Sequence, residues 1–451
     1  MEQTMTSSPI SRETALSSGP RAAAPVQAGT RPPASAQVIG KTHTGRLPFI
    51  DNLRWVMIML VLSMHAAVTY SHLGSWYYVE DSPVGPIQAG IFATYQATLQ
   101  SFFMGFLFFI AGYFVPGAYD KKGPGKFLGD RAFRLGIPLL LYVFILQPVA
   151  VYCMSLFHGP DTAPQGFLHL YGRYISTGRW LGGTGPLWFC EALLIFCLGY
   201  ALFRVFARMA PGISEGRKGV YGETGAGAIA AGAGVGGDPG KTFPGGDFPG
   251  KTRIWGFIIL ITVLTFLVRF PWPNGTSFYN LQFCYFSQYV LFFIAGTMAF
   301  RGHWLDKLST GDGNYWRRVA LIGGSICWVA LLALGGAFKG GVSAYQGGLH
   351  WQSLGMSFWE SMCGVGLSLY FLVLFRERFN KQGKWAGFFS ANAFAVYVFH
   401  PPVLIAISRM MGGLQWPPLL KFVILTLLSI VVTYALCAWV IRRIPLLKRV
   451  L

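Results

Sequence analysis

The sequence predicts an all-α integral membrane protein with ten transmembrane helices and both termini in the cytoplasm. Of its 451 residues, 53% are hydrophobic and only 12% are charged, whereas about a quarter of the residues of a soluble domain are charged. Ten stretches are long and apolar enough to cross a hydrocarbon layer about 30 Å thick, which takes about 20 helical residues. The basic residues also gather in alternate loops, as the positive-inside rule requires.

The ten predicted spans follow from apolar runs that polar loops separate. The fifth run is short, and the eighth contains an acid, Glu360. Between the fourth and fifth runs, residues 209–253 are rich in Gly and Pro and show no helical period, which predicts a flexible cytoplasmic loop. The predicted spans lie near residues 48–70, 90–115, 135–157, 186–207, 254–271, 283–300, 318–337, 356–375, 391–411 and 418–441.

The basic residues give the predicted orientation. Lys and Arg number 36 against 17 Asp and Glu, a net charge of +19. Of the 36, 29 fall in the tail, the C-terminus and every second loop, whereas the opposite loops hold only Arg173, Arg179 and Lys339. This split places both termini in the cytoplasm. The positive charge is then explained by the orientation of the protein in the membrane, and no nucleic-acid partner is expected.

Three regions are predicted. Residues 1–47 are rich in Ala, Pro, Ser and Thr and predict a disordered cytoplasmic tail. Residues 48–442 form the membrane domain, and 443–451 form a short basic cytoplasmic C-terminus. All seven cysteines lie in apolar segments without a CxxC pair, so neither a disulfide framework nor a metal site is indicated.

Two polar residues share one face of the first span. Arg54 and His65 are eleven positions apart, almost three helical turns, which separates them by about 16 Å along the axis. Charged groups in hydrocarbon cost about 2.5–3.5 kcal/mol each and therefore suggest a function. With the N-terminus inside, an anion-binding group lies at the cytoplasmic surface and a proton acceptor near the outer side. The alternatives are a snorkelling anchor for Arg54 and a packing residue for His65.

A second basic pair opens the third span. Arg131 and Arg134 are three residues apart, so on an α-helix they share a face. Two guanidinium groups suit bidentate capture of phosphate groups. The alternative interpretation is an ordinary basic loop that only sets topology.

Two acids, Glu191 and Glu360, lie deeper inside spans than the terminal turn. Each follows about five residues after its span enters from the outer side, which places it about 7 Å deep, near the depth of His65. A carboxylate beside an imidazole fixes its tautomer and raises its basicity. Glu191 is the better candidate for orienting His65, and Glu360 either lines the pocket or reaches the membrane interface.

His400 lies about mid-membrane, where Pro401 and Pro402 are expected to interrupt the ninth span. A broken helix exposes backbone groups that must line a cavity or find partners, so His400 is either a pocket residue or a hydrogen-bonded residue at a kink. The predicted outer loops are aromatic, including Trp76, Tyr77 and Tyr78. Interfacial belts explain such residues, and a sugar-stacking surface is the alternative.

Several motifs together resemble the membrane-bound acyltransferase-3 family over about residues 47–442. The nearest branch is the one that contains the succinyltransferase of periplasmic glucans. No single motif is specific, but the combination is. The motifs are Arg54 and His65 with ten residues between them, Phe108-Phe-Ile-Ala-Gly-Tyr-Phe114, Arg131-x-x-Arg134, Pro186-Leu-Trp-Phe189 and Tyr397-Val-Phe-His400.

The resemblance implies an enzyme of a bacterial inner membrane that moves an acyl group from cytoplasmic acyl-CoA to a carbohydrate hydroxyl at the outer face. It implies a catalytic His65 with Arg54 as its required partner, while Arg131 and Arg134 would hold the phosphates of coenzyme A. Acyl-CoA would be a co-substrate, with no permanently bound cofactor and no metal. The predicted pocket candidates are Trp188, Glu360, Tyr397 and His400.

Two other functions are compatible with the sequence. Ten spans with buried His and Glu residues would also suit a proton-coupled transporter of a polysaccharide or a lipid-linked sugar. Against a transporter, the first and second halves of the sequence show no broken helices at matching positions. A catalytically silent membrane partner is the third possibility. Acetyl, succinyl and longer acyl groups all remain open.

Overall fold

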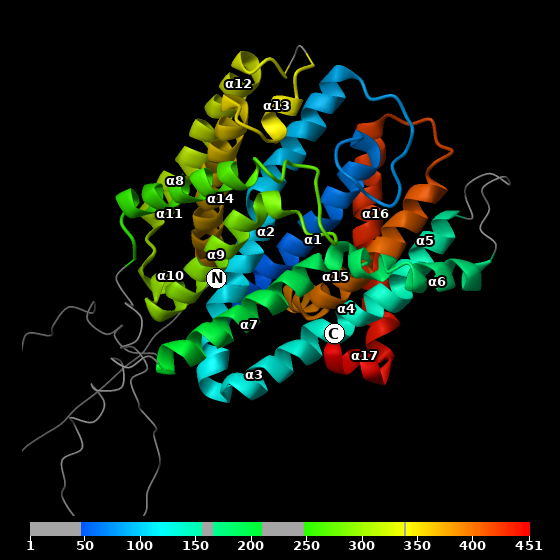
Figure 1. Cartoon of the computed structure of the whole chain (residues 1–451), viewed down its shortest axis with the longest axis horizontal. Helices are drawn as coiled ribbons and strands as arrows, with labels where there is room; N and C mark the ends of the chain where they lie inside the picture. The colour runs from blue at the N-terminus through cyan, green and yellow to red at the C-terminus, as the bar shows by residue number, and fades with distance from the viewer. Residues whose placement is uncertain (1–46, 156–165, 210–247, 338–339) are drawn as a thin grey trace, which may run out of the picture. The chain divides into compact units, whose positions relative to one another are not determined.

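A computed structural model describes residues 47–155, 166–209, 248–337 and 340–451 (Figure 1). Within these ranges the chain is almost wholly helical, and ten helices are long and apolar enough to cross a membrane. The predicted all-α fold and the ten spans are therefore confirmed. The predicted tail, apart from Leu47, and residues 210–247 of the predicted loop lie outside the described part, and the loop's last residues, 251–253, already belong to a helix.

Six spans are single helices or nearly so, and four are composite. Short helices connect them: α6 (Phe167–Ser176), α10 (Trp304–Lys307) and α13 (Ser343–Gln346), while α17 (Pro445–Val450) ends the chain. The spans are α1 (Pro48–Ser71), α2 (Pro86–Lys122), α3 to α5 (Pro124–Ser155), a 3₁₀ turn with α7 (Gly185–Ala207, α7 itself being Trp188–Met209), α8 (Lys251–Val268), a 3₁₀ turn with α9 (Phe283–Arg301, α9 itself being Phe286–Arg301), α11 with α12 (Thr310–Leu334), α14 (Trp351–Arg378), α15 (Lys384–Met410) and α16 with a final turn (Pro418–Arg443).

Prolines shape two of these spans in different ways. In the third span, π turns at Ala132–Gly136 and Tyr142–Leu146 directly precede segments that contain Pro138 and Pro148. A proline lacks the N–H for the carbonyl four residues earlier and its ring crowds that carbonyl, and a wider π turn relieves the conflict. The ninth span behaves otherwise, because α15 continues through its two prolines. The predicted interruption at that point is wrong.

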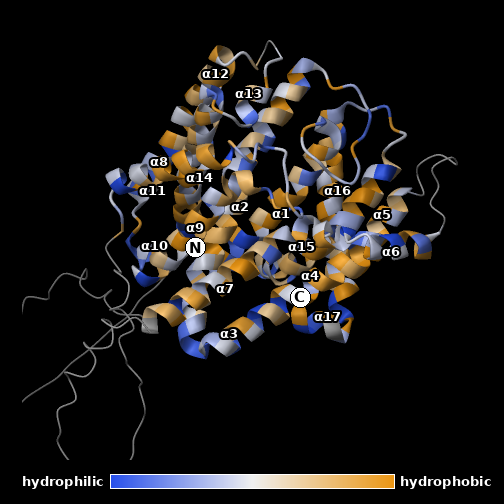
Figure 2. Ribbon diagram, in the orientation of Figure 1, coloured by the Kyte–Doolittle hydropathy of each residue, from blue (hydrophilic) through white to orange (hydrophobic). Residues whose placement is uncertain are grey.

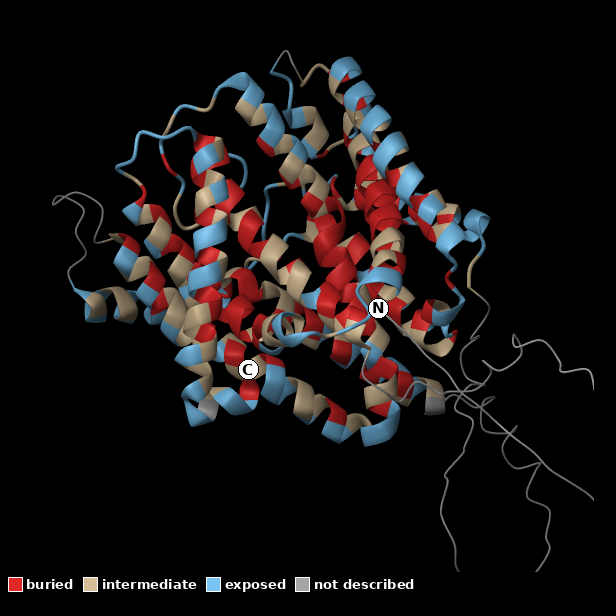
Figure 3. Ribbon diagram, turned by 180° about the vertical axis from the view of Figure 1, so that it is seen from behind, coloured by how far each residue is buried: buried red, intermediate tan, exposed pale blue. Residues whose placement is uncertain are grey.

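Helix α1 lies at the centre of the bundle. It packs against α2, α14, α15 and α16, which surround it on several sides (Figure 1). The most buried spans are α2 and α14, followed by α15 and α1, whereas the 310–334 span is the least buried. Figure 3 shows the buried residues gathered in the inner helices. Residues of α1 are therefore well placed to form a site that several helices enclose.

Large apolar side chains cover the outside of the bundle. Ile326, Val329 and Val431 are each 63% to 66% exposed, and Figure 2 shows that the long helices are largely hydrophobic along their length. A water-soluble protein rarely exposes apolar patches of this extent. A lipid environment explains them, because hydrocarbon is as apolar as these side chains.

The tightest helix pair is α2 with α9. A Cβ atom at Gly112 would overlap the carbonyl oxygen of Phe293, and one at Gly296 would overlap the carbonyl oxygen of Phe109. Each glycine thus lies against the backbone of the opposite helix. Small residues at such positions let membrane helices approach closely, which increases their van der Waals contact.

Candidate functional site

His65 lies in the last two turns of α1, and two other rings approach its imidazole. The indole of Trp76, in the loop that follows α1, stacks on His65 with ring centroids 3.9 Å apart and planes 17° from parallel. The ring of His400, on α15, lies 5.4 Å away, also 17° from parallel. His65 itself is only partly buried. The site therefore consists of an accessible imidazole held among aromatic rings.

His400 is the residue that the fold brings to His65 from farthest along the sequence. Its side chain is fully buried, and its Nδ1 lies 2.8 Å from the carbonyl oxygen of Tyr397. This agrees with the predicted hydrogen-bonded residue near prolines, and it also places His400 in the site. The approach of His400 to His65 was not predictable from the sequence, because it depends on how α15 packs against α1.

The loop over residues 72–85 is fastened at several points around the site. The Tyr77 hydroxyl contacts the hydroxyl of Tyr142, 2.9 Å away, and donates a hydrogen bond to Gln147 on α5. The guanidinium of Arg409 lies 4.7 Å from the ring centroid of Tyr78. Burial raises the pKa of Tyr77, so its phenol stays protonated and remains a donor. These contacts hold Trp76 over His65.

A buried ion pair fixes the same loop to the last span. Lys421 Nζ on α16 lies 2.6 Å from Glu80 Oε1, and the two side chains are only 3% and 8% exposed. The backbone N–H of Glu80 also donates to the carbonyl of Thr69 at the end of α1. Sequence reasoning missed this pair, although a Lys four residues into an apolar span was a signal that a buried partner exists.

Tyr397 connects α15 to the start of the fourth span. Its hydroxyl donates a hydrogen bond to the carbonyl of Pro186, and its ring lies 6.2 Å from that of His400. Trp188, two residues after Pro186, stacks on Tyr289 with the ring centroids 5.5 Å apart. The motifs around Pro186 and Tyr397 are therefore joined in space, and Tyr397 reaches the site through His400.

Glu191 forms no hydrogen bond with His65 among the described residues. It lies half-buried near the start of α7, and its Oε2 is buried without a hydrogen-bond partner in the described part of the chain. Aromatic rings rather than a carboxylate contact the His65 imidazole. The orienting role of Glu191 stays a prediction, and it would require a movement of α7 or of the side chain.

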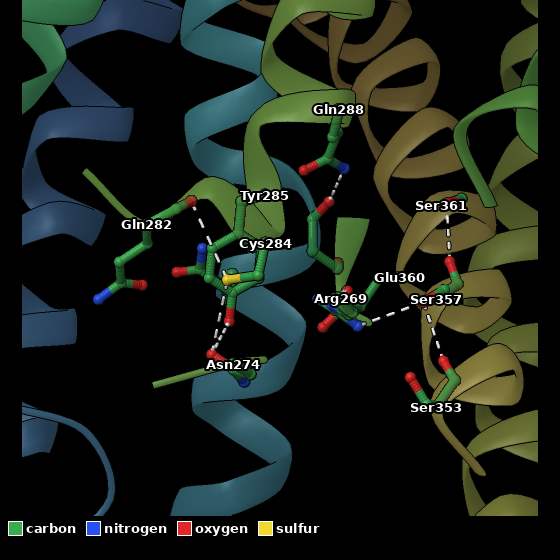
Figure 4. A network of polar contacts seen from close by, with 12 residues as sticks. Arg269, Asn274, Gln282, Cys284, Tyr285, Gln288, Ser353, Ser357, Glu360 and Ser361 are labelled. Atoms are coloured by element: carbon green, nitrogen blue, oxygen red, sulfur yellow. Dashed lines mark hydrogen bonds and ion pairs between the residues drawn. The ribbon is translucent and has the colours of Figure 1, made fainter. Parts of the chain in front are cut away.

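Glu360 belongs to another polar network, which Figure 4 shows. Its Oε2 lies 2.5 Å from the Arg269 guanidinium, and the two side chains are 8% and 0% exposed. Arg269 also lies 3.4 Å from the Ser357 hydroxyl and 5.4 Å from the Tyr285 ring centroid. The interpretation that Glu360 reaches the membrane interface is therefore wrong, because its carboxylate is buried against a cation.

At the opposite end of α1, Arg54 lies 55% exposed, 3.8 Å from the Asp51 carboxylate. Arg131 is half-buried over the ring of Phe127, with 5.3 Å from the guanidinium carbon to the ring centroid, and Arg134 is exposed. The π turn that begins at Ala132 holds more residues than an α turn. The two arginines are therefore farther apart around the axis than the predicted α spacing implied.

Two neighbouring arginines differ from Arg131 and Arg134 in their partners. Arg204 and Arg301 both pair with Asp120, at 3.1 and 2.5 Å. Within the described ranges, neither Arg131 nor Arg134 forms an ion pair with an acidic side chain.

Comparison with known proteins gives one strong match. No curated protein and no solved structure matches the chain significantly. A family model described as an acyltransferase domain matches residues 47–438, which include every span as far as the end of α16. The chain therefore belongs to the acyltransferase-3 family, a family of acyltransferases, and it does so as a multi-pass membrane protein.

Proposed function

We propose that this acyltransferase takes its acyl group from cytoplasmic acyl-CoA and transfers it to a carbohydrate hydroxyl at the outer face of a bacterial inner membrane. The observation that carries the proposal is the environment of His65. Its imidazole is partly accessible, lies at the end of α1 opposite Arg54, and is enclosed by Trp76 and His400. One helix thus joins an anion-binding end to a proton-accepting end.

The donor would bind at the Arg54 end. Arg54, and with it Arg131 and Arg134 near the start of the third span, offer guanidinium groups on the predicted cytoplasmic side, and planar guanidinium groups bind phosphate oxygens in a bidentate manner. The phosphates of coenzyme A are the anions of the proposed donor. Its pantetheine arm would then extend along α1 and carry the thioester over the roughly 16 Å that eleven residues of helix span.

The proposed reaction needs one base and a thioester that is bound next to the acceptor hydroxyl. His65 removes the proton of the acceptor hydroxyl while the oxygen attacks the thioester carbonyl. The new C–O bond forms, the C–S bond breaks, and the proton passes from His65 to the sulfur of coenzyme A. Holding donor and acceptor in contact supplies much of the acceleration, because it converts a bimolecular encounter into a step within one complex.

The acceptor would approach from the His65 end, past the loop over residues 72–85. Trp76, Tyr77 and Tyr78 lie in this loop, and aromatic faces cover the apolar face of a pyranose ring. Periplasmic glucans are the acceptors of the branch that the motifs resemble. They are the first acceptors to test, with succinyl-CoA and acetyl-CoA as donors.

The experiment uses the purified protein in proteoliposomes with labelled acyl-CoA outside and glucan inside. We expect wild-type transfer, its loss in His65→Ala, and a raised KM for acyl-CoA in Arg131→Ala. His350→Ala is the matched control, since His350 is exposed and precedes α14. Full activity of His65→Ala would overturn the proposal.

The transporter alternative receives no support from Glu360. A proton-coupled carrier needs a carboxylate that gains and loses a proton during the cycle, whereas Glu360 is held by Arg269 at 2.5 Å. Sugar flux in sealed vesicles without any acyl-CoA would favour the transporter. Flux that depends on acyl-CoA, with label in the product, supports the acyltransferase.

A further inference from the structure

Pro401 determines how the His400 ring is held. In a regular helix the carbonyl of Tyr397 would accept the N–H of residue 401, four positions on, but Pro401 has no N–H. The structure places His400 Nδ1 2.8 Å from that carbonyl oxygen. Because a carbonyl only accepts, Nδ1 must be the protonated nitrogen. A neutral His400 ring therefore presents Nε2 as a free lone pair.

That Nε2 lacks a partner in the structure. His400 is 0% exposed, and its Nε2 is buried with no hydrogen-bond partner among the described residues. A buried acceptor without a donor costs free energy, and structures retain such groups mainly where something else uses them. The hydrogen-bonded kink explains Nδ1 only, so Nε2 needs a separate explanation.

The ring positions indicate where its donor is. The Trp76, His65 and His400 centroids form a triangle with sides of 3.9, 5.4 and 6.3 Å. Its angle at His65 is close to a right angle. The His65 and His400 rings are nearly parallel, with their planes 17° apart and their centroids 5.4 Å apart. If a rotation of the His65 imidazole turned one of its nitrogens toward Nε2 of His400, this centroid distance would leave about 3 Å between the two nitrogens, a hydrogen-bond length.

We propose that His400 is the positioning residue for His65: when the His65 ring turns its N–H toward His400, that N–H donates a hydrogen bond to the unpartnered Nε2. This rests on the proposed function, in which His65 is the base. The bond fixes the tautomer of His65, so that its other nitrogen faces the acceptor hydroxyl. When His65 takes the hydroxyl proton, the neutral His400 ring stabilises the imidazolium without itself being protonated. This is the orienting role that the sequence predicted for Glu191.

Two substitutions separate this role from a structural one. In His400→Gln an amide atom takes the place of Nε2 and can accept the His65 N–H. In His400→Asn the shorter amide can still bond the Tyr397 carbonyl but leaves nothing at the Nε2 position. We expect kcat to fall about 10- to 100-fold in His400→Asn, with unchanged KM for acyl-CoA, and to recover in part in His400→Gln. Equal kcat in both variants, or a lower kcat in His400→Gln, would overturn the assignment.

The prolines offer a second, independent test. Pro401→Ala restores an N–H for the Tyr397 carbonyl and so weakens its hold on Nδ1. Pro402→Ala is the matched control, because it changes the same helix but restores a donor for Val398 instead. We expect kcat to fall about fivefold in Pro401→Ala, the effect of one net hydrogen bond, and to stay at the wild-type value in Pro402→Ala. An equal loss in both would show that helix shape alone matters.

His65→Ala in the same assay separates failure of this inference from failure of the proposed function. An active wild type, an inactive His65→Ala and a fully active His400→Asn would reject only the role of His400. A fully active His65→Ala would reject the proposed function and this inference together. Unfolding temperatures of all variants identify any that lose activity because they lose the fold.

Discussion

The indole of Trp76 covers one face of the His65 imidazole, with their ring centroids 3.9 Å apart. The His400 ring lies nearly parallel to the same imidazole, with the two centroids 5.4 Å apart. Water can therefore approach the His65 imidazole only from the sides that these two rings do not cover. In the proposed reaction His65 activates a hydroxyl beside a thioester and water is the competing nucleophile, so this cover would protect the acyl group from hydrolysis.

Removing the Trp76 side chain should increase hydrolysis at the expense of transfer. In Trp76→Ala we expect about tenfold less acyl transfer, with more free acid released per acyl-CoA consumed, because the exposed imidazole also activates water. Trp76→Phe should retain part of the transfer. The measurement is the ratio of free acid to acylated glucan. Trp272→Ala is the control, since Trp272 packs on Phe278 and Phe283 in another loop, and an unchanged ratio in Trp76→Ala would contradict the prediction.

The pair of Lys421 and Glu80 should be important for stability. Lys421→Met leaves the Glu80 carboxylate buried without its cation, and breaking a buried pair in this way costs about 3–5 kcal/mol. We expect a clearly lower unfolding temperature in detergent. The double variant Glu80→Gln with Lys421→Met should recover much of the loss, because no unpaired charge remains. A single variant as stable as the wild type would show that the pair contributes nothing.

Glu360 and Arg269 should affect stability much more than catalysis. Arg269→Ala leaves Glu360 buried and unpaired, which should cost about 3–5 kcal/mol. The folded fraction should keep a wild-type kcat, because the network of Figure 4 has its own partners, Ser357 and Tyr285. Thermal unfolding and activity per folded molecule are the two measurements. A Glu360→Gln variant with normal stability but no transfer would instead support the prediction that Glu360 lines the substrate pocket.

The close approach of α2 and α9 should not tolerate a single added methyl group. Gly112→Ala and Gly296→Ala each place a Cβ on a backbone oxygen of the facing helix, so the helices must separate. We expect a strong loss of folded protein for each. Gly199→Ala in α7 is the control, since a Cβ there meets nothing within 4 Å. If the Gly112→Ala variant is obtained in normal amounts and has a normal unfolding temperature, α2 and α9 can move apart at little cost.

The sequence was sufficient for the elements that depend on local composition. Hydropathy finds a span wherever about 20 apolar residues follow one another, so α1 and α16 begin and end close to the predicted limits. Even the predicted alignment of Arg54 and His65 needs only the helical period. The π turn after Arg131 escaped prediction, because it results from local conflict at a proline rather than from hydropathy.

The site itself could be predicted only in part. His65 stands out because a lone imidazole in an apolar run is costly, and Glu360 stood out for the same reason. What each of them contacts depends on packing between helices far apart in the chain, which no periodicity encodes. Hence neither the approach of the His400 ring to His65 nor the pairing of Glu360 with Arg269 was predicted, and the role of Glu191 beside His65 stays a prediction.

The fastening of the 72–85 loop has a consequence for biosynthesis. Glu80 leaves the ribosome 341 residues before its partner Lys421, and at ordinary synthesis rates that interval lasts about 20–70 s. During this time the newly made loop lacks the cation that anchors it, and His65 lacks its neighbour on α15. The helix that carries His65 therefore gains its full set of neighbours only after α16 has been inserted. A chain that stops before α16 would hold every residue of the proposed chemistry and still lack a finished enzyme.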